Sequence, residues 1–353
     1  MHASQSEIAE GRPGADERDR ARVRDLIAWA WAGLDDDLLQ PGLDPSGVLP
    51  LVAPDTREFY WEVHFEAGRP TRLDFLHRAT LQRSARSFAA CPDPVLEDLR
   101  RWYEQDEVAA RFHPSVWLEV DGPLRGERPG WSQGVSVCLD RYIGTPRAHD
   151  VATLAVPAVR TLPLAESLWS ACGASRYPSR PLERAIGAAV AHGGFVRHLS
   201  VMRGRQGCPG KVYASLPKSA LREFLRDVGW PGSIEGANSL AALVCSESAR
   251  VNLDLEMREE ITERIGFELF GDPDASTDPR RGLPLERARS CELIGTAQVA
   301  ALQRWASSEA RCLGTDLWPS RLTRRLDLKF VLHAQHRLEL KAYLGFAANQ
   351  GIF

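Results

Sequence analysis

The sequence predicts an α+β fold: a ten-stranded antiparallel barrel built from five α-β-β-α repeats, with helices outside and a polar lumen. Three observations support this prediction: five segments read as strand pairs joined by tight turns, helical patterns fill the gaps, and the strands alternate polar and apolar residues. Side chains alternate across a strand, so each hairpin has one polar and one apolar face. Helices need an apolar surface to cover, so the polar faces should line the lumen. The hairpins are expected at Phe59–His77, Ser115–Asp140, Phe195–Leu216, Arg250–Phe270 and Arg325–Phe346.

The segments outside the hairpins supply the helices. In Asp19–Leu34, apolar residues recur at helical spacing, which predicts the first helix. Residues 1–17 are polar and contain Gly and Pro, so we expect a disordered lead-in followed by a single domain over residues 18–353. Further helices are predicted at Pro94–Ala110, Arg180–His192, Pro217–Val228, Asn238–Cys245 and Thr296–Ala310.

Composition excludes several classes of function. The 353 residues carry a net charge of −3 without a basic stripe, which argues against nucleic-acid binding. The seven cysteines are scattered and form no Cys-x-x-Cys pair, so neither a disulfide framework nor a zinc site is implied. No stretch of 18 or more apolar residues suggests a membrane span. We therefore expect a cytoplasmic protein with no nucleic-acid or membrane partner, and the sequence leaves its oligomeric state open.

The predicted inward faces combine cations, carboxylates and aromatic rings. Arg and Lys bind phosphate, whereas the faces of Tyr and Trp stabilise a carbocation. A carboxylate beside them can act as a general base. Together these groups suit breaking a carbon–diphosphate bond and transferring the resulting allyl cation. The residues concerned are Glu62, Arg72, Trp117, Lys211, Tyr213, Arg264, Lys341 and Tyr343.

Five α-β-β-α units around such a barrel resemble the ABBA-type aromatic prenyltransferases, the fold of the dimethylallyl-tryptophan synthases. In that family the first hairpin carries a Glu base followed by a diphosphate-binding Arg, which Glu62 and Arg72 match in spacing. The family's Arg-x-Lys-x-Tyr strand is matched by Lys211-Val212-Tyr213, with Pro209 at the Arg position. Its inward tyrosine on the last strand is matched by Tyr343.

The resemblance implies a prenyltransferase that needs no metal and no cofactor. Its partners would be a prenyl diphosphate and an aromatic acceptor, either a small molecule such as an indole or tryptophan, or a peptide side chain. Glu62 would be the catalytic base. The diphosphate would be held by Arg72, Lys211, Arg264 and Lys341, and the cation would be shielded by Trp117, Tyr213 and Tyr343.

Two hairpins depart from the family pattern and keep other functions open. The second reads Ser136-Val137-Cys138 where the family has Lys-x-Tyr, and the fourth carries Arg264 and Glu268. An acid-rich lumen favours a second hypothesis: a barrel that has lost diphosphate binding and binds or modifies a basic peptide or amine in natural-product biosynthesis. A third hypothesis is an interaction protein of two α+β domains, divided near Thr145–Gly193.

Two further motifs have plainer interpretations. The run Asp35-Asp36-Asp37 lacks helical spacing for two carboxylates on one face, so we interpret it as a cap and not as a metal site. His333 and His336 flank the last turn, where we expect both to be exposed.

Overall fold

The described strands of the computed structural model form one antiparallel sheet of eleven strands. The structure describes residues 15–39, 43–52, 56, 58–67, 71–80, 101, 104–105, 115–122, 136–140, 158–171, 177–202, 209–270, 282–314, 316 and 318–349. The strands are β1 (Glu58–Glu66), β2 (Arg72–Thr80), β3 (Ser115–Val120), β4 (Ser136–Asp140), β5 (Phe195–Met202), β6 (Gly210–Pro217), β7 (Arg250–Met257), β8 (Ile261–Leu269), β9 (Ser307–Arg311), β10 (Ser320–Leu332) and β11 (Leu338–Asn349).

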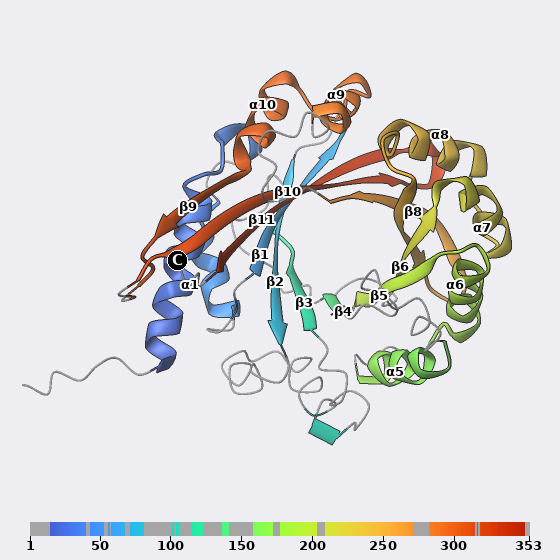
Figure 1. Ribbon diagram of the computed structural model, residues 1–353, viewed down its shortest axis with the longest axis horizontal. Helices are drawn as coiled ribbons and strands as arrows, with labels where there is room; N and C mark the ends of the chain where they lie inside the picture. The colour runs from blue at the N-terminus through green and yellow to red at the C-terminus, as the bar shows by residue number, and fades with distance from the viewer. Residues whose placement is uncertain are drawn as a thin grey trace, which may run out of the picture.

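The strand pairings return to the first strand. Each strand from β1 to β8 pairs with the next, β8 pairs with β10, β10 with β11, and β11 with β1. The sheet therefore curls around a central lumen (Figure 1). All five predicted hairpins are present, and the prediction of a curled antiparallel sheet with outer helices is confirmed. β4 pairs with β5 across the segment Thr145–Gly193, where the two-domain hypothesis placed its boundary.

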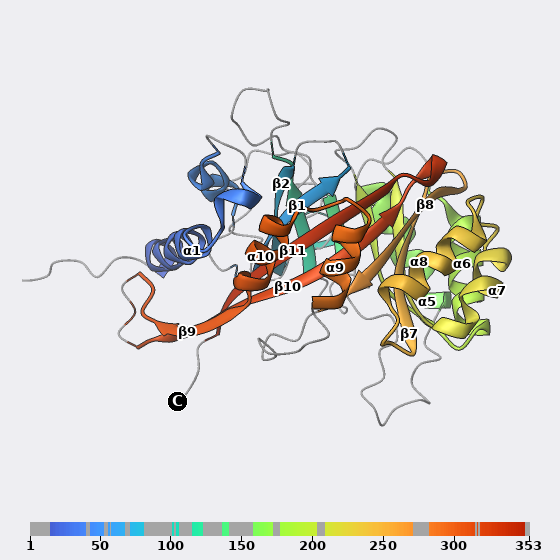
Figure 2. The ribbon, with the colours of Figure 1, turned by 90° about the horizontal axis from the view of Figure 1, so that it is seen from above.

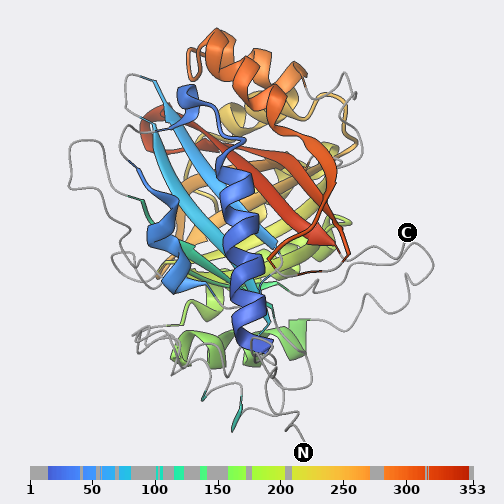
Figure 3. The ribbon, with the colours of Figure 1, turned by 90° about the vertical axis from the view of Figure 1, so that its left-hand side faces the viewer.

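The described helices lie outside the sheet (Figures 1 and 3). None of them is both long and apolar enough to cross a membrane. Most of Pro94–Ala110 lies outside the described residues, so the organisation into five repeats stays a prediction.

The helix α1 includes residues 15–17, which were predicted to belong to the disordered lead-in, while residues 1–14 are outside the described part. The helices are α1 (Ala15–Trp31), α5 (Ala158–Ala171), α6 (Ser179–Ala191), α7 (Leu221–Asp227), α8 (Ile234–Val244), α9 (Gly282–Ser290) and α10 (Thr296–Trp305), with short 3-10 turns at Asp36–Leu38, Pro45–Leu51, Lys218–Ala220 and Ala334–His336.

One helix prediction is wrong at its end. The helix expected over Thr296–Ala310 stops at Trp305, and β9 occupies Ser307–Arg311. Ser307 and Ser308 favour helix ends over helix interiors because their hydroxyls compete for backbone hydrogen bonds. The segment pairs instead with the first part of β10, and the two strands extend away from the rest of the sheet (Figure 2).

Apolar side chains on the outer face of the sheet pack under the helices. On β1, Phe59, Trp61 and Val63 are completely buried. The Trp31 ring of α1 lies edge-on to Trp61, with centroids 5.2 Å apart. Burial of such apolar area is the main force that holds helices against a sheet. The outward direction of the apolar faces leaves the polar faces for the lumen, as the alternation predicted.

The order of the strands fixes which end of the lumen is which. The five hairpin turns follow strands β1, β3, β5, β7 and β10, which all run in one direction because their neighbours are antiparallel. The last residues of these five strands therefore lie at one end of the lumen, which we call the hairpin end. Their first residues lie at the opposite end, which we call the helix end.

Candidate active site

The lumen holds a cavity at its helix end with a volume of about 600 Å³. This size is ordinary for a small-molecule site. Strands from all around the barrel contribute to its wall. Six of the eight predicted site residues line it: Glu62, Trp117, Lys211, Tyr213, Lys341 and Tyr343.

A second cavity, of about 820 Å³, lies at the hairpin end. The other two predicted site residues, Arg72 and Arg264, line this hairpin-end cavity. Lys341 lines both cavities. The structure therefore divides the predicted diphosphate-binding set between two spaces, where alternation along the strands had suggested a single one.

A layer of buried ion pairs separates the two cavities. Asp254, which is fully buried, pairs with Lys329 at 2.6 Å and with Arg264 at 2.7 Å. Burial alone would raise the pKa of Asp254, but the charges of Lys329 and Arg264 outweigh it and hold that pKa well below its usual range. Gly266 faces this pair from β8, and a Cβ there would lie 2.0 Å from Oδ1 of Asp254. Only glycine leaves room for the pair.

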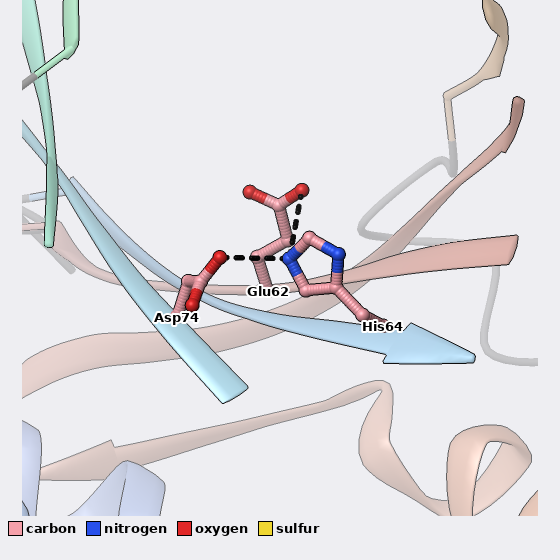
Figure 4. Close-up of side chains that lie close together, drawn as sticks. All are labelled: Glu62, His64 and Asp74. Carbon is pink, nitrogen blue, oxygen red and sulfur yellow. Dashed lines mark hydrogen bonds and ion pairs between the residues drawn. The ribbon is translucent and has the colours of Figure 1, made fainter. Parts of the chain in front are cut away.

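The same layer continues across β1 and β11. Glu62 accepts a hydrogen bond from Nζ of Lys341 at 2.6 Å, and both side chains are buried. Behind Glu62, Nε2 of His64 lies 2.8 Å from Asp74 and 3.5 Å from Glu62 (Figure 4). Arg72 donates a short hydrogen bond to Asp74. The proposed base is thus held among fixed charges. We call this set of paired side chains the charged layer. It comprises Glu62, His64, Arg72, Asp74, Asp254, Arg264, Lys329, Glu339 and Lys341.

His64 is the centre of this arrangement. Its Nδ1 hydrogen-bonds Glu339 at 2.7 Å, and the other oxygen of Glu339 hydrogen-bonds His333 at 2.7 Å. Burial and Lys341 would lower the pKa of His64, but the carboxylates of Glu62 and Asp74 outweigh them and raise it. His333 is half-buried by its contact with Glu339, so its predicted exposure is wrong, whereas His336 is exposed as expected.

Glu62, His64 and Asp74 place three potential ligand atoms within 4.8 Å of one another, a spacing compatible with a metal ion. Lys341 and Arg72 already neutralise the two carboxylates, and their positive charges oppose a further cation. We therefore assign this cluster to ion pairing.

Aromatic rings form much of the wall of the helix-end cavity. The Tyr60 ring centroid lies 5.2 Å from that of Trp117 and 6.4 Å from that of Tyr343. Opposite in the sheet, the rings of His198 and Tyr213 are 3.8 Å apart. Burial, with help from Glu62, raises the pKa of Tyr343 well above its usual value, so this ring remains a neutral phenol. Neutral aromatic faces attract cations through their quadrupole.

Arg197 is a cavity residue that alternation along the strands does not predict. Val196 pairs with Ala214 and His198 with Tyr213, so Arg197 is an extra residue at a β-bulge. The bulge lets both Arg197 and His198 line the helix-end cavity, which strict alternation forbids. The Nη1 atom of Arg197 is buried without a hydrogen-bond partner among the described residues. Periodicity carries no signal for a bulge, so only the structure reveals this arginine.

The helix-end cavity has no excess of positive charge. Among the described residues of its wall, five are acidic and five are basic. Several of the basic groups are already paired: Arg325 lies 2.9 Å from Glu58, and Arg78 lies 3.2 Å from the same carboxylate. Arg197 is paired more loosely, with Nη1 3.8 Å from Glu268.

Solved structures with a similar fold include prenyltransferases. The crystal structure of the prenyltransferase NotF has a TM-score of 0.51 and 11% identity, over 81% of this chain and 80% of that one. The chain therefore has an aromatic-prenyltransferase-like fold, as the resemblance implied. The prenyltransferase PriB aligns over 95% of this chain and 96% of its own at TM-score 0.49 and 14% identity. The 5-dimethylallyltryptophan synthase from Streptomyces coelicolor aligns over 94% and 96%, at TM-score 0.46 and 14% identity. No protein-family model and no curated protein matches the sequence.

Removal of Asp254 should destabilise the barrel. The variant Asp254→Asn leaves Lys329 and Arg264 buried without their carboxylate, so we expect the free energy of unfolding to fall by about 3 kcal/mol. Urea denaturation measures this change. The matched control is Asp227→Asn, which breaks an exposed pair with His192 and should cost less than about 1 kcal/mol. Equal costs for the two variants would contradict the buried layer.

The stability that His64 contributes should depend on pH. Because its folded-state pKa is raised above the usual 6.5, its contribution is fully present below about pH 6.5 and is lost as pH rises through the folded value. The difference in unfolding free energy between the wild type and His64→Gln should therefore be largest in mild acid and shrink toward alkaline pH. A difference that grows with pH would show that His64 is neutral in the folded protein.

Proposed function

We propose that the chain transfers an allylic prenyl group from its diphosphate to an aromatic acceptor within the helix-end cavity. One arrangement carries the proposal: a buried carboxylate, Glu62, opens onto a cavity with aromatic walls and basic side chains. The aromatic-prenyltransferase-like fold is compatible with it. The acceptor would be an indole, tryptophan or the aromatic side chain of a peptide.

The chemistry assigns each group a step. The bond between the allylic carbon and the diphosphate oxygen breaks, and the electron pair leaves with the diphosphate. Tyr60, Trp117 and Tyr343 shield the allylic cation while a ring carbon of the acceptor attacks it. The acceptor then loses a proton to the carboxylate of Glu62. This sequence balances without a metal or a redox cofactor.

The diphosphate would bind at the basic side chains of the same cavity. Lys211 and Lys341 remain from the predicted set, with Lys341 shared between the diphosphate and Glu62, and Arg197 and Arg325 join them. Arg72 and Arg264 line the hairpin-end cavity, and each is paired with a buried aspartate. We therefore propose that these two arginines support the charged layer and do not bind the diphosphate.

The transfer reaction can be tested directly. The purified chain is incubated with dimethylallyl or geranyl diphosphate and a panel of indoles, tryptophan and aromatic peptides, and products are detected by mass spectrometry. Glu62→Gln should lower turnover by about 10²-fold or more, because the base is lost. Glu66→Gln, on the same strand but in the hairpin-end cavity, should leave turnover unchanged. Absence of transfer and of diphosphate binding in folded protein would refute the proposal.

The balanced charge of the helix-end cavity favours one alternative. The five acidic groups of this cavity can pair with a cationic ligand. A cavity lined only by basic groups would instead repel such a ligand. The alternative is a barrel that binds or modifies a basic peptide or amine. In that case a short Lys- or Arg-rich peptide should bind tightly, as measured by calorimetry.

Substitution of two glutamates distinguishes specific binding of a cationic peptide in the helix-end cavity from non-specific charge attraction. Glu268 lines the helix-end cavity and Glu256 the hairpin-end cavity. Under the alternative, Glu268→Gln weakens binding of the cationic peptide and Glu256→Gln does not. Equal affinities in the wild type and Glu268→Gln would rule out cationic recognition in this cavity.

We further propose a cytoplasmic location and a role in natural-product biosynthesis. Three cysteines of the described part, Cys245, Cys291 and Cys312, are free thiols. Free thiols are typical of a reducing compartment. The biosynthetic role follows from the proposed transfer to an aromatic acceptor, and the prenyl-transfer assay described above tests both.

A further inference from the structure

His64 is enclosed by carboxylates on both sides of its ring. Nε2 lies 2.8 Å from Oδ2 of Asp74, and Nδ1 lies 2.7 Å from Oε1 of Glu339. Carboxylates accept hydrogen bonds but cannot donate them when ionised, so both ring nitrogens need a hydrogen to satisfy these contacts. Nη2 of Arg72 also lies near Nε2, at 3.3 Å, but the two shorter contacts are both with carboxylates, so the geometry fits an imidazolium. The raised pKa of His64 agrees with this reading.

Glu62 has two cations beside the same oxygen atom. Nζ of Lys341 lies 2.6 Å from Oε1 of Glu62, and Nε2 of His64 lies 3.5 Å from it (Figure 4). A general base must be ionised before it can accept a proton. An opposite charge within about 4–6 Å stabilises the ionised form of a carboxyl group by the equivalent of one to three pH units.

We propose that His64 is a positioning residue whose imidazolium, together with Lys341, keeps Glu62 ionised and correctly placed to accept the proton of the aromatic acceptor. This inference rests on the proposed function. His64 itself lies on the far side of Glu62 and lines the hairpin-end cavity, so it does not contact the substrate.

The surroundings of His64 determine when this effect operates. The charged groups that face its ring are Glu62 from β1, Arg72 and Asp74 from β2, and Glu339 and Lys341 from β11, with His333 behind Glu339. The three carboxylates favour the imidazolium, and the two cations oppose it. His64 lines the hairpin-end cavity, on the other side of the charged layer from the cavity proposed to hold the substrate.

Two variants and two readouts test the role of His64. In His64→Gln the neighbouring positive charge is lost, so Glu62 should hold its proton more tightly. The titration midpoint of the Glu62 carboxyl, followed by ¹³C NMR in the free protein and assigned with Glu62→Gln, should rise by about one pH unit or more. The acid limb of the pH profile of kcat/KM should rise by the same amount. Glu339→Gln, which removes a negative charge beside the imidazolium and leaves His64 in place, should raise neither value.

The control is His192→Gln, which removes a histidine–carboxylate pair on the outer surface and should move neither readout. An unchanged Glu62 midpoint in His64→Gln would overturn the role of His64, even if the wild type transfers prenyl groups. Absence of transfer in the wild type, with the expected shift in midpoint, would overturn the proposed function and retain the electrostatic coupling. A fall in the midpoint would show that His64 is not cationic.

Discussion

A layer of buried ion pairs across the lumen decides which side chains can face each cavity. Buried charges are costly unless each finds an opposite partner, so Asp254, Lys329 and Arg264 must satisfy one another. This pairing constrains the sequence at Gly266, because a larger residue there would collide with Asp254. It also fixes the proposed base, because one oxygen of Glu62 lies beside both Lys341 and His64. Among the described residues, the charged layer therefore lies between two cavities with different linings.

This division explains why the predicted site residues do not all line one cavity, although the fold is aromatic-prenyltransferase-like. The outer apolar faces and their helices make an aromatic-prenyltransferase-like fold independently of what fills the lumen. Inside the lumen, Arg72 and Arg264 pair with Asp74 and Asp254 and line the hairpin-end cavity, not the aromatic one. The aromatic wall, Glu62 and the remaining cations stay together at the helix end. In the proposed function, substrate binding would then rely on loosely paired groups such as Arg197.

Alternation of polar and apolar residues predicted the strands and their inward faces well, because burial of one face is a strong constraint on sequence. It assigned Glu62, Tyr343 and Lys341 to the lumen correctly. The position of Arg72 directly after the first turn places it near the hairpin end, but alternation could not show that a charged layer separates this end from the aromatic cavity, since that layer depends on long-range charge pairing. It missed Arg197 because a bulge shifts the period by one residue. The same local view extended the helix through Ser307, whose pairing partner lies in β10.

The division of the lumen can be tested with a structure of the chain soaked with inorganic pyrophosphate, and then with dimethylallyl thiolodiphosphate and an indole. We expect the phosphates to lie in the helix-end cavity against Lys211 and Arg197, with the ion pairs of Asp254 and Glu62 intact. Phosphates bound at Arg72 and Arg264 in the hairpin-end cavity, with those pairs broken, would contradict it.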